Sequence, residues 1–149
     1  MRLRSSLLAA VGVGCALVGV VSTPASAAPQ TRNVNVATGR CLDSNGGGNV
    51  YTLGCNGGNY QLWSVEYDQS GGAEVKNVAT GRCLDSNGNG NVYTLGCNGG
   101  NYQRWRAHPS GDYIMVWKNI ATGRCLDSNG NGNVYTLGCN GGNYQRWGL

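Results

Sequence analysis

The stretch Asn35–Trp63 reads NVATGRCLDSNGGGNVYTLGCNGGNYQLW, and it recurs without a gap at Asn77–Trp105 and at Asn119–Trp147. Of its 29 columns, 26 are identical in all three copies, whereas the two spacers between the copies are equal in length but differ in sequence. A repeat with a period of 42 residues indicates that one small unit of structure is built three times.

Each copy alternates short strand patterns with turns. Runs of Asn and Gly such as Asn45–Asn49 favour turns, and in the strand pattern after this run Tyr51 and Leu53 fall on one strand face. The four strands that we expect in the first copy cover residues 40–43, 50–53, 60–67 and 73–78. The sequence therefore predicts an all-β protein with four strands per repeat and twelve in total.

The number of repeats limits the possible folds. Three units are too few for a long solenoid, which also needs distinct capping repeats, and three blades are fewer than a propeller usually has. A closed barrel with pseudo-threefold symmetry, the β-trefoil, remains. The third copy stops just after Trp147, whereas an extra strand-like segment, Thr31–Val36, leads into the first copy. We expect this segment to complete the last hairpin and close the barrel.

The six cysteines of the repeats occur as two per copy, 14 residues apart. Threefold symmetry admits two pairings, one within each copy and one from each first cysteine to the second cysteine of a neighbouring copy. Loop entropy favours the local pairing. The expected disulfides are Cys41–Cys55, Cys83–Cys97 and Cys125–Cys139.

The first 27 residues resemble a secretory signal peptide in composition. Two arginines precede an apolar run, Leu7–Val21, and the small residues after it predict cleavage between Ala27 and Ala28. The run is short for a membrane span. We therefore expect a secreted protein whose single domain covers residues 28–149, without membrane insertion.

The composition of the expected mature chain argues against several functions. Its nine basic and seven acidic residues nearly balance, which gives no electrostatic reason to expect a nucleic acid partner. A glycosidase needs two carboxylates about 5–10 Å apart, but each repeat offers one aspartate, and His108 is the only histidine of the chain. We do not expect an enzyme. A trefoil protease inhibitor would use a loop of one repeat, for which Tyr113–Trp117 is one of two asymmetric candidates.

Metal binding is not expected either. The chain has no Cys-x-x-Cys motif for zinc. Asp85–Gly90 and Asp127–Gly132 begin like a calcium-binding EF loop, but the twelfth position is glycine instead of glutamate. We expect no metal and no cofactor.

A Gln-x-Trp motif near the end of each copy, with Cys-Leu-Asp upstream, resembles the ricin B-chain type of β-trefoil lectin. We interpret the motif as structural, because the tryptophans can converge near the barrel axis and the glutamines can bind turn backbone. The motif residues are Gln61, Trp63, Gln103, Trp105, Gln145 and Trp147.

A narrower resemblance covers essentially the whole mature chain. Val-Tyr-Thr-Leu followed by Asn-Gly-Gly-Asn-Tyr-Gln is similar to the actinohivin group of small three-repeat lectins, which bind high-mannose glycans. This resemblance implies one sugar pocket per copy, made of Asp, Tyr, Leu, Asn and Tyr. The implied residues are Asp43, Tyr51, Leu53, Asn56 and Tyr60 in the first copy, Asp85, Tyr93, Leu95, Asn98 and Tyr102 in the second, and Asp127, Tyr135, Leu137, Asn140 and Tyr144 in the third.

These residue types suit a sugar. A carboxylate accepts hydrogen bonds from vicinal hydroxyls, an amide both donates and accepts, and aromatic or aliphatic side chains cover C–H surfaces. The galactose-binding branch of the ricin type usually carries an aromatic residue where this chain has Leu53, and often Asn where it has Tyr60, so mannose is favoured. Two plainer interpretations stay open: Asp43 could cap the turn after it, and the tyrosines could be half-buried strand residues.

The leading hypothesis is a secreted, non-catalytic, monomeric lectin with three equivalent pockets for α-mannose residues of high-mannose glycans. The alternative is a polysaccharide-targeting module for xylan or for galactose-containing glycans.

Overall fold

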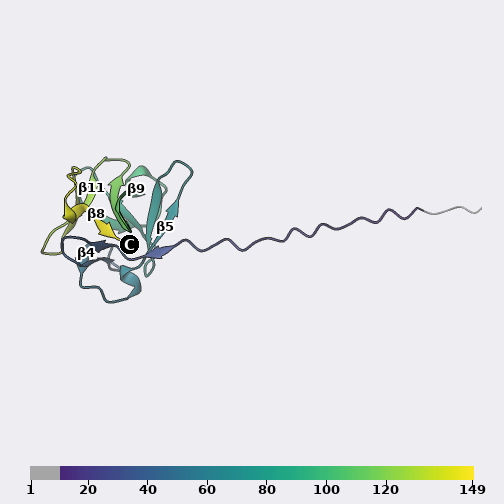
Figure 1. Ribbon diagram of the computed structural model, residues 1–149, viewed down its shortest axis with the longest axis horizontal. Coiled ribbons are helices and arrows are strands. Elements are labelled where there is room, and N and C mark those ends of the chain that lie inside the picture. Colours follow the sequence, from purple (N-terminus) through teal and green to yellow (C-terminus); the bar gives the residue numbers. More distant parts are fainter. Residues whose placement is uncertain (1–10) are drawn as a thin grey trace, which may run out of the picture.

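The computed structural model of the protein describes residues 11–149. The predicted signal peptide starts at residue 1, so its first ten residues lie outside this part. Residues 11–27 form neither helix nor strand, and they leave the folded domain as an exposed segment (Figure 1). None of the helices in residues 11–149 has the length and apolar character needed to cross a membrane.

The described residues form thirteen strands and three short 3-10 helices. The strands are β1 (Gln30–Thr31), β2 (Val34–Asn35), β3 (Cys41–Ser44), β4 (Val50–Leu53), β5 (Trp63–Tyr67), β6 (Ala73–Asn77), β7 (Cys83–Ser86), β8 (Val92–Leu95), β9 (Arg104–Gly111), β10 (Ile114–Asn119), β11 (Cys125–Ser128), β12 (Val134–Leu137) and β13 (Trp147–Gly148). The 3-10 helices are η1 (Asn59–Gln61), η2 (Asn101–Gln103) and η3 (Asn143–Gln145).

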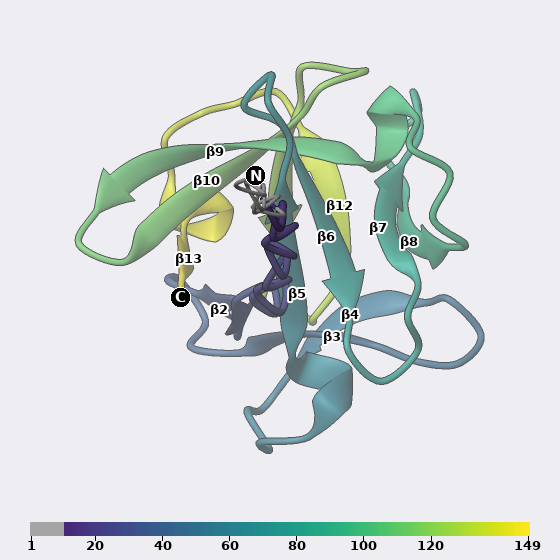
Figure 2. The same ribbon diagram turned by 90° about the vertical axis from the view of Figure 1, so that its right-hand side faces the viewer.

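The strands close into a barrel. Antiparallel pairing runs from β5 through β6, β9 and β10 to β13. Trp147 and Gly148 of β13 then pair with Asn35 and Val34 of β2, while β1 of the same N-terminal segment pairs with β5. This segment therefore joins the last strand to the first hairpin, as predicted, and the β-trefoil is confirmed (Figure 2). The strand total is thirteen instead of twelve because the N-terminal segment is divided into β1 and β2.

Three further hairpins, one from each repeat, contact one another in a cycle. They are β3–β4, β7–β8 and β11–β12. Isolated bridges join Tyr51 to Asn133, Asn49 to Tyr93 and Asn91 to Tyr135. Buried hydroxyl pairs link the same hairpins, as between Ser86 Oγ and Thr136 Oγ1 at 3.2 Å. Each hairpin is therefore held by both of the others.

The long strand predicted from Tyr60 to Tyr67 is wrong in its first part. Residues 59–61 form η1, and β5 begins only at Trp63. The side chain of Gln61 is fully buried there. A tight turn replaces extended backbone at this point because the glutamine has to point inward, and the same replacement occurs at η2 and η3.

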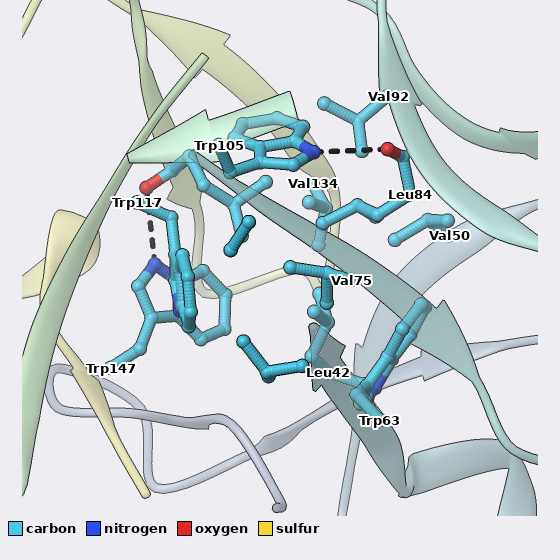
Figure 3. Packing of buried hydrophobic residues seen from close by; sticks show 13 residues of the cluster. Leu42, Val50, Trp63, Val75, Leu84, Val92, Trp105, Trp117, Val134 and Trp147 are labelled. Atoms are coloured by element: carbon cyan, nitrogen blue, oxygen red, sulfur yellow. Dashed lines mark hydrogen bonds between the residues drawn. The ribbon is translucent and has the colours of Figure 1, made fainter. Parts of the chain in front are cut away.

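The tryptophans form the core, as predicted from Gln-x-Trp. Trp63, Trp105 and Trp147 are fully buried and pack with valines and leucines from all three repeats (Figure 3). Each indole donates a hydrogen bond to a backbone carbonyl of its own repeat, as Trp105 Nε1 does to Leu84 O at 2.9 Å. This bond satisfies the polar atom of a buried tryptophan, so the ring can occupy the barrel interior at no cost in hydrogen bonding.

The three disulfides have the predicted local pairing. Cys41–Cys55, Cys83–Cys97 and Cys125–Cys139 each span a Cα–Cα distance of 5.1 Å. The two cysteines of each bridge are 14 residues apart in the chain. In the chain-entropy description, closing a loop of that length stabilises the fold by roughly 3 kcal/mol. Each bridge ties the start of one of the hairpins β3–β4, β7–β8 and β11–β12 to the segment just beyond its end.

Candidate functional site

Four of the five predicted pocket residues of the first copy come together. Asp43 of β3 lies directly opposite Tyr51 of β4, and Asn56 and Tyr60 approach from the turn and from η1. These four side chains line a hollow of about 240 Å³. In the second copy Asp85, Tyr93, Asn98 and Tyr102 line a hollow of about 280 Å³. We call these groups the first and second clusters; the third consists of Asp127, Tyr135, Asn140 and Tyr144.

The glutamine of Gln-x-Trp holds the aspartate of the cluster. Gln61 Nε2 donates to Asp43 Oδ2 at 2.8 Å and to Gly54 O at 3.0 Å, and Gln61 Oε1 accepts from Asn56 N at 2.9 Å. The amide is fully used and fully buried, so it fixes the orientation of the carboxylate. Asp43 Oδ1 accepts no hydrogen bond within the described residues. One carboxylate oxygen therefore keeps its acceptor capacity free, and Asp43 is among the residues that line the hollow.

The same arrangement recurs in the other copies. Gln103 Nε2 lies 2.9 Å from Asp85 Oδ2, and Gln145 Nε2 lies 2.8 Å from Asp127 Oδ2. The motif was predicted to be structural, and it also positions the site. The signal available in the sequence was the constant spacing of 18 residues between each aspartate and its glutamine.

The turn after the aspartate is capped by an asparagine. Asn45 Oδ1 accepts from Gly47 N at 3.0 Å and from Asn49 N at 3.1 Å. The plainer interpretation of Asp43 as the cap of this turn is therefore wrong, because Asn45 takes that role. Asn45 also lines the first hollow, and sequence reasoning missed it as a site residue.

Asn56 combines a local role with an open donor. Its Oδ1 accepts from Gly58 N at 2.8 Å and shapes the turn before η1. Its Nδ2 group makes no hydrogen bond in the described structure, so it is free to donate to a ligand hydroxyl. Tyr60 is about half exposed, at 49%, and it also lines the hollow.

Leucine is the predicted pocket residue that the structure does not bring to the hollow. Leu53 lies on the same strand face as Tyr51, as expected, but it is not among the residues lining the first hollow. Leu95 is likewise outside the second. Each leucine sits opposite the first cysteine of its disulfide, one step beyond the tyrosine along the strand.

The tyrosines facing the aspartates are kept neutral. Burial raises the pKa of Tyr51, and the nearby Asp43 carboxylate raises it further because a phenolate would meet a like charge. Burial and the paired aspartate act in the same way on the pKa of Tyr93 and of Tyr135. The first and second clusters thus present a phenol that can donate a hydrogen bond next to a carboxylate that accepts one, whereas in the third the Tyr135 hydroxyl donates to Ser128 O at 3.3 Å.

This raised pKa predicts how stability depends on pH. A phenol whose pKa is higher in the folded than in the unfolded state stabilises the fold below about pH 10, and this contribution is lost as the pH rises through the folded pKa. We expect the free energy of unfolding to be level from neutral pH to about pH 9 and to fall above about pH 10. Denaturant titrations at several pH values measure it. A triple variant with Phe at positions 51, 93 and 135 should show a weaker decline, and an equal decline would contradict the assignment.

Each cluster is completed by the next repeat along the chain. Arg124 of the third repeat reaches the turn of the second cluster, with Nη1 3.3 Å from Gly88 O and Nη2 2.7 Å from Thr136 O. Asn119 Nδ2 holds the carbonyl of Tyr102 at 2.8 Å. Gly90, at φ +89°, leaves the room that this packing requires, because a Cβ there would lie 2.7 Å from the Thr136 carbonyl oxygen.

We therefore expect Arg124→Ala to weaken the second cluster, although Arg124 belongs to the third repeat. Losing its two hydrogen bonds to backbone should loosen the turn at Gly88 and lower sugar affinity about three- to tenfold. Calorimetric titration of a protein in which only the second cluster is intact measures this effect. Arg40→Ala in the same background is the control, because Arg40 contacts Gly130 of the third copy instead. Equal effects of the two substitutions would contradict the cyclic arrangement.

One group of potential metal ligands occurs in residues 11–149. Glu74, Cys83 and Cys97 have ligand atoms within 4.8 Å of one another, but the two cysteines are joined in a disulfide. Their sulfurs are therefore not available as thiolates.

Solved structures with the same fold include designed and natural proteins. The designed threefold symmetric protein ThreeFoil is 29% identical over 79% of this chain and 95% of its own, with a TM-score of 0.72. The hemolytic lectin CEL-III is 28% identical over 82% of this chain and 30% of its own, with a TM-score of 0.71. SeviL, solved bound to asialo-GM1 saccharide, is 16% identical over 82% of this chain and 95% of its own, with a TM-score of 0.69, which shows the fold alone.

A model of the ricin-type beta-trefoil lectin domain matches residues 29–147, which is nearly the whole folded part of the chain. The chain therefore belongs to the ricin-type β-trefoil lectin domain family.

Proposed function

We propose that the protein is a secreted, non-catalytic lectin whose three clusters each bind one α-mannose residue of a high-mannose glycan. The observation that carries this proposal is the threefold repetition of one geometry, a carboxylate clamped by a buried glutamine beside a neutral phenol. A structural role alone would not require one carboxylate oxygen to stay without a partner in a solvent-open hollow.

The geometry matches the hydrogen-bonding pattern of a hexose. Asp43 Oδ1 can accept from a sugar hydroxyl, while the Asn56 amide and the Tyr51 hydroxyl can donate to neighbouring oxygens. Tyr60 can cover the apolar C–H face of the ring. No side chain of the cluster is arranged as a nucleophile with an adjacent base, which fits a binding site rather than a catalytic one.

Three weak sites can give one strong interaction. A shallow, polar hollow of about 240 Å³ offers few buried contacts, so a single sugar should bind weakly. A branched glycan that occupies two or three clusters gains avidity of roughly 10²–10⁴ if the spacing allows it. High-mannose glycans carry several terminal mannoses, which is why we favour them as partners.

A second candidate is a polysaccharide-targeting module for galactose-containing glycans or xylan. An exo-β-1,3-galactanase from Clostridium thermocellum shares the fold with 22% identity, over 86% of this chain but 31% of its own, at a TM-score of 0.75. That protein combines a trefoil of this kind with a much longer chain. This candidate predicts retention on the insoluble polysaccharide and no binding to mannan.

A glycan array with high-mannose, galactose and xylan series tests the proposal. We expect signals on the high-mannose series that increase with the number of terminal mannoses. Signals restricted to xylan or galactose would replace mannose by the second candidate. An oxidised protein that is folded by circular dichroism and binds no glycan would overturn the lectin assignment.

A further inference from the structure

An unpaired basic group lies on the hairpin β9–β10. Arg106 of β9 is directly opposite Lys118 of β10, and His108 follows two residues later on the same strand. All three are exposed, and none takes part in an ion pair or donates a side-chain hydrogen bond within residues 11–149. Together with Ile120 and Gly123 they line a hollow of about 210 Å³. Two cations placed directly opposite each other repel, and an anion in this hollow would relieve that repulsion.

The threefold-related hairpin β5–β6 provides an internal comparison. It has a lysine at the matching position, but Lys76 Nζ lies 4.0 Å from Glu66 and 3.6 Å from Glu74. Where β5–β6 has Glu66 and Glu74, β9–β10 has His108 and Val116. The hairpin β9–β10 therefore lacks acidic partners for Lys118, and it has Arg106 where β5–β6 has Ser64.

Strand register connects the basic hollow to β12, the strand that carries Tyr135 of the third cluster. Arg106 is opposite Lys118, Lys118 is opposite Cys125, and Cys125 is opposite Leu137, so the four residues form one row across β9–β12. Adjacent strands lie about 4.8 Å apart, so the backbone at Lys118 is at most about 10 Å and at Arg106 at most about 14 Å from Leu137, and Tyr135 of the third cluster lies two residues from Leu137 on β12. These are distances that an oligosaccharide longer than one ring can span.

The turn that closes the hollow also contacts Cys139, the residue before Asn140 of the third cluster. Gly123 lines the hollow, and its carbonyl oxygen lies 3.7 Å from Cys139 Sγ. Asn140, a member of the third cluster, is the next residue along the chain. The two sites are therefore neighbours on one surface.

The flanks of the other two clusters have different charges. Beside the second cluster, a hollow of about 330 Å³ is lined by Glu66, Asp68, Glu74 and Arg104 together with Gly99, which follows Asn98. These acids are ion-paired, Asp68 with Arg104 and the two glutamates with Lys76. Beside the first cluster, the row that ends at Leu53 runs through Cys41 and Val34 to Gly148 and carries no charge. The three clusters are thus identical in their sugar-facing residues and differ in what surrounds them.

We propose that the basic hollow binds an oxyanion group, a sulfate or phosphate ester or a carboxylate, carried by a glycan whose neutral terminal sugar occupies the third cluster. The guanidinium of Arg106 offers two parallel N–H donors to such a group, and the Lys118 ammonium adds a second charge. The glycan part of this inference rests on the proposed function, whereas the anion part rests on the hollow alone.

A charge exchange between the two hairpins tests the proposal. The variant R106S/H108E gives β9 the residues of β5 while leaving every cluster untouched, and S64R/E66H is the reciprocal variant. The probes are a neutral mannose oligosaccharide, the same oligosaccharide after chemical sulfation, and sodium sulfate alone, each titrated by calorimetry at low salt. We expect the unmodified protein to bind the sulfated probe about five- to tenfold more tightly than the neutral one, with the difference shrinking as salt screens the charges.

The outcomes separate the two proposals. The R106S/H108E variant should lose the preference and keep its affinity for the neutral probe, which also reports that the fold is intact. Equal affinity of the unmodified protein for both oligosaccharides, or a preference that survives the exchange, would overturn the anion site. Sulfate binding that depends on Arg106 without any oligosaccharide binding would support the hollow and overturn the lectin assignment instead.

Discussion

Replacing Asp43, Asp85 and Asp127 together by asparagine should abolish detectable binding to a multivalent high-mannose glycan. The neutral amide still offers an oxygen to the clamping glutamine, so the local geometry is kept. It lacks the charge that strengthens hydrogen bonds from sugar hydroxyls. Losing all three sites removes the whole avidity gain of about 10²–10⁴ as well as the intrinsic affinity. Surface plasmon resonance on an immobilised high-mannose glycoprotein measures the effect.

The single variants show how much each cluster contributes to binding. Asp43→Asn alone should leave two sites and a partial avidity, and the three single variants should be similar because the clusters are alike. Asparagine is preferable to alanine here, because Asp43 is only 3% exposed and its removal would cost about 1–3 kcal/mol from the unpaired glutamine amide. Binding by the triple variant equal to that of the unmodified protein would eliminate the aspartates as sugar ligands.

Trp105→Ala should cause one of the largest losses of stability among single substitutions in the core, comparable to the same change at Trp63 or Trp147. Trp105 is fully buried and contacts the core shared by all three repeats, and truncation of such a side chain costs about 3–5 kcal/mol. A domain of this size has a free energy of unfolding of about 5–15 kcal/mol, so the variant should be marginal or unfolded at 37 °C. Equilibrium denaturation with the disulfides intact measures the change.

Two matched variants show what the indole contributes. Trp105→Phe keeps most of the volume but leaves the Leu84 carbonyl without the donor that lies 2.9 Å away, so a loss of about 1–3 kcal/mol is expected. Tyr113→Ala, at a residue that is 81% exposed, should change stability by less than about 0.5 kcal/mol. A comparable loss in the Tyr113 variant would show that the tryptophan does not have a special role.

The fold was largely predictable because its signals are local and occur three times. Turn residues, alternating strands and cysteines 14 residues apart each act over short distances, and their repetition makes closure with threefold symmetry the economical solution. The one local error, at residues 60–62, arose where a buried glutamine overrides strand propensity. Nothing in the spacing of Tyr60 and Trp63 shows that Tyr60 belongs to a 3-10 turn that ends before Trp63.

The candidate site was predictable in its residue types and incomplete in its connections. Asp43, Tyr51, Asn56 and Tyr60 were implied by the resemblance to the actinohivin group, whereas the lining role of Asn45 and the positioning role of Gln61 were not. A glutamine that binds turn backbone and one that also clamps a carboxylate look the same in a sequence. Only the burial of both groups distinguishes them.

The amino-acid sequence by itself determined the number of repeats, the disulfide pairing and the barrel, because all of these follow from short-range patterns. The tertiary structure decided which repeat completes which cluster and what charge lies beside it. Arg124 supports the second cluster, and Arg106 and Lys118 lie next to the third, through contacts between segments far apart in the chain. The three copies are nearly identical in sequence, but their surroundings differ because a different segment of the chain packs beside each.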